Sequence, residues 1–246
     1  MRNLLSLCLI AVAATSLFAQ EGMDGPKPSS VSRKYAEYRL VNLEPKWGLA
    51  KIKTLVKGLK EDQDMNRKVT DQIFNSWNVQ EKFTYTMIHG EDFSQNCDMM
   101  PQIVDEEKKV FSHFPGAFND EATWSERQIK FMEANRAKVI ELMKTTIVAK
   151  NRVGNNFKHA IWNLNAVELI PTLVTVYSKN KKDHDILTVL MLLMKDNKFP
   201  AFLKTSTYKK LFGEEDNWRS YVMASPALYK ETIGLAGGLY KSKKVR

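Results

Sequence analysis

The sequence predicts an all-α protein made of stacked antiparallel helical hairpins, arranged as an irregular α-solenoid or a bundle. Apolar side chains recur at spacings of three and four along most of the chain, which is the periodicity of helices with one buried face. No segment in the first half alternates apolar and polar residues over strand length, so no β-sheet is expected. With 246 residues, the chain is long enough to bury a core without disulfides or metals.

The first nineteen residues have the layout of a cleaved signal peptide. Arg2 is their only charge, an apolar run spans residues 4–14, and the small residue Ala19 closes the segment. A membrane-spanning helix needs about 20 apolar residues, so this run is too short to be one. We therefore expect cleavage after Ala19, export to the periplasm or medium of a bacterium, and a mature chain without a transmembrane segment. A lipoprotein anchored through Cys8 and an uncleaved membrane anchor are the alternatives.

The charge and the cysteine content limit the classes of partner and the cellular location that are expected for this protein. With Arg2 removed from the 37 basic residues, 36 stand against 28 acidic ones, which gives a net charge of +8. Such a balance favours peripheral contact with an anionic surface such as envelope lipid, whereas an exported protein has no expected nucleic-acid partner. Cys97 is then the only cysteine, so no intramolecular disulfide can form. The chain also lacks Asn-x-Ser/Thr signals, and both features favour a bacterial envelope protein.

The mature chain divides into a tether, one domain and a tail. Residues 20–34 combine Gly, Pro, Ser and charge, which indicates a flexible tether. Residues 35–240 are expected to form a single α-helical domain with an N-terminal half, 35–150, and a C-terminal half, 151–240. The tail, residues 241–246, is basic.

Helical periodicity locates the elements of the N-terminal half. It predicts helices near residues 45–59, 69–77, 83–88, 104–111 and 124–148. In the last of these, Ser125 and Gln128 form a capping box. The buried stripe of this helix is expected to consist of Ile129, Met132, Val139, Ile140, Met143 and Ile147. Frequent Gly, Pro, Asn and Asp residues indicate loops over the rest of 89–123.

The C-terminal half begins with a predicted helical hairpin over residues 163–195. Pro171 is expected to bend its first helix, and the second helix, from Asp185, is apolar on nearly all sides and should be buried between neighbours. An Ile-Pro helix, an Asp-containing turn and an apolar return helix together resemble one HEAT-type repeat, which implies stacked helical pairs. Ile186-Leu187 stand where such repeats often place a basic residue, and no second copy follows at a period of about 40 residues. Ser225 and Pro226 are expected to start the last helix.

Reactive side chains gather in one loop region. A cysteine nucleophile needs a neighbouring base, so Cys97 with His89 or His113 could form a hydrolase site. The two histidines with Glu91 and Asp92 could instead hold a metal ion, although the chain has no His-x-x-x-His or HExxH element. Glycine-rich phosphate loops, GxSxG and dinucleotide fingerprints are absent, so no cofactor is expected.

Tryptophan and tyrosine residues divide into core and surface candidates. Trp77 and Trp124 fall in line with the predicted buried stripes and are expected in the core. The aromatic residues considered for partner contact are Trp162, Tyr177, Tyr208 and Trp218.

Two functional hypotheses follow. The favoured one is a non-catalytic scaffold that binds a protein or peptide of the bacterial envelope in a groove formed by residues 155–215. The alternative is a hydrolase or metal-dependent enzyme with its site in the loop region 89–113. That alternative requires Cys97, His89 and His113 to converge in a pocket.

Overall fold

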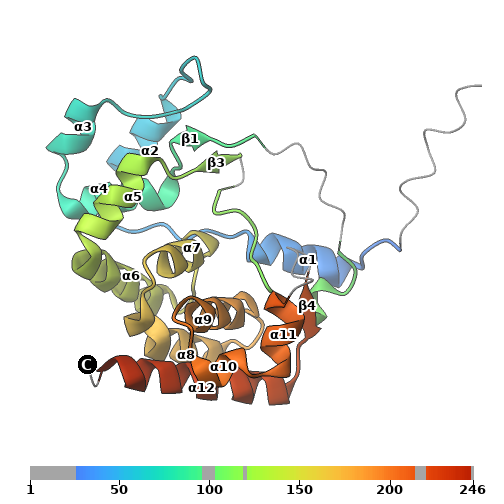
Figure 1. Cartoon of the computed structure of the whole chain (residues 1–246). Coiled ribbons are helices and arrows are strands. Elements are labelled where there is room, and N and C mark those ends of the chain that lie inside the picture. The colour runs from blue at the N-terminus through green and yellow to red at the C-terminus, as the bar shows by residue number, and fades with distance from the viewer. Residues whose placement is uncertain (1–25, 96–102, 119–120, 214–219, 245–246) are drawn as a thin grey trace, which may run out of the picture.

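The protein is predominantly α-helical, which confirms the predicted class (Figure 1). A computed structural model describes residues 26–95, 103–118, 121–213 and 220–244. These residues contain twelve α-helices, two short 3₁₀ helices and two antiparallel strand pairs. Within this part of the chain, no helix is long and apolar enough to cross a membrane.

The first six helices lie within residues 30–150. They are α1 (Ser30–Arg39), α2 (Leu49–Lys57), α3 (Asp71–Ser76), α4 (Val79–Ile88), α5 (Glu126–Ala134) and α6 (Arg136–Lys150). The other six are α7 (Asn155–Asn163), α8 (Ile170–Lys179), α9 (Asp185–Asp196), α10 (Pro200–Leu203), α11 (Ser206–Phe212) and α12 (Pro226–Lys244). The last helix runs beneath α8 to α11 and carries the C-terminal end of the chain (Figure 1).

Helix α9 is the centre of the C-terminal half. It packs against α7, α8, α10 and α12, and every residue from Asp185 to Met194 is buried. This confirms the expectation drawn from its apolar sequence, because a helix without a polar face must be covered on all sides. Trp77 and Trp124 are also buried, as predicted.

Pro171 does not bend its helix, and this prediction was wrong. The 3₁₀ turn η2 (Val167–Leu169) precedes α8, which begins at Ile170, so the proline lies in the first helical turn. An N–H group there has no acceptor within the helix, and proline therefore costs no hydrogen bond at this position.

The predicted helix over 124–148 is two helices that meet at Asn135. At Asn135 the backbone leaves the helical conformation, with φ −113° and ψ 24°, and the Asn135 side chain donates to the carbonyl of Phe131 at 2.9 Å. The capping box of Ser125 and Gln128 is confirmed. The predicted stripe is buried apart from Ile129, which is 37% exposed because α5 buries Phe131 instead.

Short strands replace the helix predicted over 104–111. After the 3₁₀ turn η1 (Glu106–Lys108), strand β2 (Lys109–Phe111) pairs with β4 (Tyr221–Met223). Strand β1 (Asp92–Phe93) pairs with β3 (Ala122–Thr123). The expectation of no strands was wrong at these positions, because strands of two or three residues are shorter than any window in which period-two alternation can be detected.

The tether predicted over 20–34 is wrong for residues 30–34, which belong to α1. Ser29 caps this helix by accepting a hydrogen bond from the N–H of Ser32 at 3.1 Å. Tyr35 and Arg39 on the same helix are buried. At the other end of the chain, α12 continues to Lys244, so the described part of the basic tail is helical.

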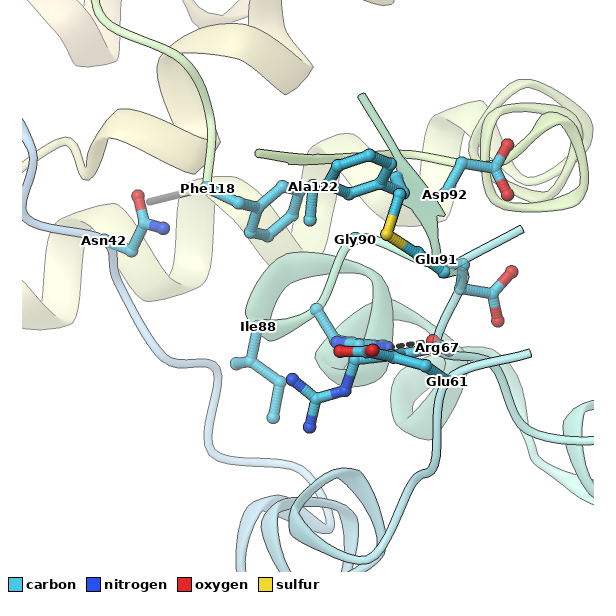
Figure 2. Close-up of a pocket in the computed structure, with 12 residues that line it drawn as sticks. Asn42, Glu61, Arg67, Ile88, Gly90, Glu91, Asp92, Phe118 and Ala122 are labelled. Carbon is cyan, nitrogen blue, oxygen red and sulfur yellow. Dashed lines mark hydrogen bonds between the residues drawn. The ribbon is translucent and has the colours of Figure 1, made fainter. Parts of the chain in front are cut away.

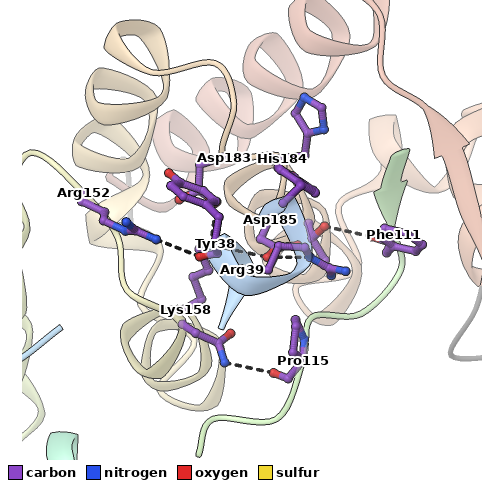
Figure 3. A network of polar contacts seen from close by, with 12 residues as sticks. Tyr38, Arg39, Phe111, Pro115, Arg152, Lys158, Asp183, His184 and Asp185 are labelled. Atoms are coloured by element: carbon purple, nitrogen blue, oxygen red, sulfur yellow. Dashed lines mark hydrogen bonds and ion pairs between the residues drawn. The ribbon is translucent and has the colours of Figure 1, made fainter. Parts of the chain in front are cut away.

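A buried group of charges joins α1 to the rest of the protein (Figure 3). The Arg39 guanidinium lies 2.6 Å from Glu106 Oε1 and 3.0 Å from Asp185 Oδ1. It also lies over the ring of Phe111, 4.6 Å from its centre. One side chain therefore connects α1, the segment around η1 and β2, and α9.

Lys158 extends this buried charge network to α7. Its ammonium group lies 2.6 Å from Asp183 Oδ1 and 3.5 Å from Asp185 Oδ2. Burial alone would raise the pKa of Asp185, but Arg39 and Lys158 lower it below the ordinary value. Burial raises the pKa of Asp183, and Lys158 offsets only part of that effect. The charged form of Asp185 therefore stabilises the fold, whereas the charged form of Asp183 does not.

We predict that Asp185→Asn lowers the free energy of unfolding at about pH 7 by roughly 3–5 kcal/mol, because it leaves Arg39 buried without its main partner. A depressed pKa contributes stability above the ordinary aspartate value of about 3.9, and this contribution is lost as the pH falls through the folded value. Urea unfolding should therefore show a smaller gap between variant and wild type at about pH 3. The matched control, Asp183→Asn, should cost less at neutral pH. Equal losses for both variants would contradict this account.

Candidate functional site

The N-terminal half contains an open cleft of about 350 Å³ (Figure 2). It is lined by residues of the segment 61–67 after α2, by residues 88–93 at the end of α4 and in β1, and by Phe118 and Ala122, the first residue of β3. Asn42 completes the lining. We call this space the N-terminal cleft. A second cleft of about 540 Å³ adjoins it, shares Glu91 and Asp92 with it and extends to residues 125–127.

Local hydrogen bonds shape the segment 61–67. The carboxylate of Asp62 accepts from the N–H groups of Asp64 and Asn66, each at 2.9 Å, which closes a tight turn. The Asn66 side chain then accepts from the N–H of Phe93 at 2.9 Å. This turn leaves Met65 47% exposed at the cleft.

Gly90 allows the opposite walls of the cleft to approach each other. A Cβ atom at this position would lie 2.8 Å from the Phe118 ring and 2.8 Å from the carbonyl oxygen of Thr123. Only glycine fits at such distances without displacing backbone. The sequence therefore has a glycine two residues before β1, where the chain passes close to Phe118 and Thr123.

Hydrogen bonds from three side chains distant in the sequence fix residues 115–117, which precede Phe118. The Asn155 amide donates to the carbonyl of Gly116 at 2.6 Å, and the Asn42 amide donates to that of Ala117 at 2.8 Å. His159 Nε2–H donates to the carbonyl of Pro115 at 2.6 Å. Burial lowers the pKa of His159 to about 4, so the ring is a neutral donor. Phe118 is thereby fixed edge-on against Trp124, with 5.7 Å between the ring centres.

Glu91 is fully engaged inside the protein. Its carboxylate accepts from Arg127 Nε at 2.8 Å, from the Tyr85 hydroxyl at 2.7 Å and from Ser125 Oγ. A second nitrogen of Arg127 also contacts it. These donors occupy the oxygen lone pairs of the carboxylate, so Glu91 joins α4, α5 and β1 as a structural group.

The two histidines of the enzyme hypothesis belong to different polar networks. His89 is buried, and its Nε2–H donates to the carbonyl of Arg67, while burial lowers its pKa and keeps it neutral. His113 Nδ1 lies 2.7 Å from Ser112 Oγ, and the His113 carbonyl accepts from Arg39. His89 lines the N-terminal cleft and His113 does not. Cys97 lies outside the described residues.

The proposed metal ligands are likewise not assembled. Within residues 26–95, 103–118, 121–213 and 220–244, no group of three or more His, Cys, Asp or Glu side chains is arranged to hold a metal ion. Glu91 is held by Arg127, and His113 lies with the Arg39 group.

The aromatic residues considered for partner contact lie in different surroundings in the described part of the chain. Tyr177 is 1% exposed and packs edge-on against Tyr229, so it belongs to the core and offers no surface to a partner. Trp162 donates to Asp196 Oδ2 at 2.7 Å, and Tyr208 packs against Phe202 and Phe212. Trp218 lies outside the described residues. The clefts described above lie in the N-terminal half, away from residues 155–215.

No protein-family model, curated protein sequence or solved structure matches this chain. Within the N-terminal cleft, the geometry combines apolar side chains with internally bonded histidine and glutamate groups.

We predict that Arg127→Met destabilises the protein by roughly 3–5 kcal/mol, because Glu91 is then a buried charge without its cation. Adding Glu91→Gln removes that charge and should restore part of the loss. Urea unfolding of both single variants and the double variant gives the coupling energy. Losses that simply add would show that Glu91 does not depend on Arg127, and would contradict its structural role.

Proposed function

We propose that this protein is a non-catalytic scaffold of the bacterial envelope, which binds a peptide or protein segment in its N-terminal cleft. One observation carries the proposal. The His89 and Glu91 side chains in the cleft are occupied by internal hydrogen bonds, whereas apolar side chains such as Met65 remain open to it. The sequence predicted a binding groove over residues 155–215, whereas this proposal places the binding site in the N-terminal cleft.

The bonding of His89 and Glu91 disfavours either side chain as a general acid or base. A general acid or base must reach the substrate and be free to exchange a proton. His89 donates its Nε2–H to a backbone carbonyl, and Glu91 is surrounded by donors. Binding sites, by contrast, are mostly apolar spaces with a few placed polar groups. The cleft offers four large apolar side chains, Met65, Ile88, Phe93 and Phe118, together with six polar or charged ones that include Arg67 and Asn42.

The envelope location rests on the sequence. In this proposal, residues 1–19 are a signal peptide that is removed after Ala19. The mature chain is a scaffold of stacked helical pairs, among which α8 and α9 form the HEAT-like one. The exposed lysines at the end of α12, Lys241 to Lys244, and the net charge of +8 support peripheral contact with an anionic surface.

A photo-crosslinking residue tests the proposal in living bacteria. Placed at position 65, it faces the N-terminal cleft, and at position 148 it lies on an exposed face of α6. Val148 is 62% exposed and apolar like Met65, so it is a matched control. We expect a discrete crosslinked product in the periplasmic fraction for position 65 and none for position 148.

Two results would contradict this proposal. One is the same crosslinking pattern at both positions, or none at either. The other is hydrolytic turnover by the purified protein that Met65→Gln abolishes while Val148→Gln leaves it intact. The second result would favour an enzyme with its site in the cleft.

A further inference from the structure

We propose that the N-terminal cleft recognises the C-terminal residue of a peptide, with Arg67 binding its carboxylate and the apolar wall binding its side chain. The inference rests on the proposed function, because it names the chemical class of the segment that the same cleft binds. It derives from the bonding state of one arginine, from the way its backbone is held and from the size of the cleft.

Arg67 differs from the other arginines that the structure describes. Arg39, Arg127 and Arg136 bind carboxylates. Arg33 and Arg152 donate to backbone carbonyls at 2.7 and 2.8 Å. Within the described residues, the Arg67 guanidinium makes no hydrogen bond and no ion pair, although it is half-buried and lines the cleft. A guanidinium offers five N–H donors in a plane, which suits a carboxylate.

The backbone of Arg67 is held on both sides. Its N–H donates to the carbonyl of Glu91 at 2.9 Å, and its own carbonyl accepts from His89. His89 is neutral and buried, so it adds no charge to the cleft. An arginine anchored in this way loses less freedom when a ligand binds than one on a mobile loop.

Three acids, Glu61, Glu91 and Asp92, line the cleft with Arg67, and none of them forms an ion pair with it within the described residues. Glu91 is occupied by Arg127, and its carboxylate points away from the Arg67 guanidinium (Figure 2). Glu61 lines the same cleft but is exposed and forms no ion pair with Arg67 in the described part of the chain. An exposed pair between the two would contribute only about 0–1 kcal/mol. Glu61 is therefore a weak internal competitor for the position that a ligand carboxylate takes.

The size of the cleft favours a chain end over a long segment. Its volume of about 350 Å³ lies at the lower end of the range for ligand sites. Met65, Phe93 and Phe118 supply an apolar wall beside Arg67. A C-terminal residue carries its carboxylate and its side chain on the same carbon, so it can contact Arg67 and this wall within one small space.

N-Acetyl-leucine is a probe that has both features, and N-acetyl-leucinamide is the matched compound without the charge. Titration of the purified protein, followed by two-dimensional amide NMR spectra, should show saturable shifts around Arg67 and Gly90 with the acid. The amide should bind at least about tenfold more weakly, since a charge-assisted bidentate contact is lost. N-Acetylglutamic acid α-amide, with its carboxylate on a side chain, should also bind more weakly than N-acetyl-leucine.

Variants distinguish the contribution of Arg67 to binding from general effects of charge. Arg67→Gln should weaken binding of N-acetyl-leucine by at least about tenfold, whereas Arg33→Gln, outside the cleft, should leave it unchanged. Glu61→Gln should tighten binding, because it removes the internal competitor. Equal binding of the acid and the amide, or no saturable shifts with the acid, would overturn carboxylate recognition. Equal binding of the glutamic acid amide would overturn a C-terminal residue as the source. Crosslinking at position 65 would in each case still support the cleft as a binding site.

Discussion

The contact between Arg39 and Asp185 is the constraint on which the rest of the structure depends. Asp185 begins α9, which is covered on all sides, so its carboxylate lies in the interior and needs compensating charge. Arg39 supplies that charge from α1, and the same guanidinium binds Glu106 in the segment that leads to β2. A few side chains therefore determine how the start of the folded chain, the irregular middle segment and the central helix are arranged.

The position of the cleft follows from this arrangement. The segment that Glu106 anchors continues to Phe118, and side chains of Asn155 and His159 from α7 hold it between these points. Phe118 and the turn 61–67 then face each other across Gly90. Among the charged side chains that line the cleft, Glu91 is bound by Arg127. Arg67 differs in that only its backbone is held, and the proposed recognition of a carboxylate rests on this difference.

Local signals in the sequence predicted several of the helices but not the cleft. The capping box at Ser125 and the apolar sequence of α9 are patterns of residues close together in the chain, and the cap and the burial of α9 were both predicted correctly. Strand β2 depends on a partner more than a hundred residues away, so its pattern resembled a helix. Tyr177 was considered a surface contact, although packing against Tyr229 of α12 buries it. Arg67 carries no local signal, because its importance lies in what surrounds it in space.

Amide hydrogen exchange tests most directly whether the buried charges join α1 and α9 into one cooperative unit. Backbone N–H groups near Arg39 in α1 and those of residues 186–194 in α9 take part in helical hydrogen bonds, so their exchange reports the opening of each helix. The account predicts that both sets exchange with the same free energy, equal to that of global unfolding. Exchange of α1 at a much lower free energy, while α9 stays protected, would contradict it.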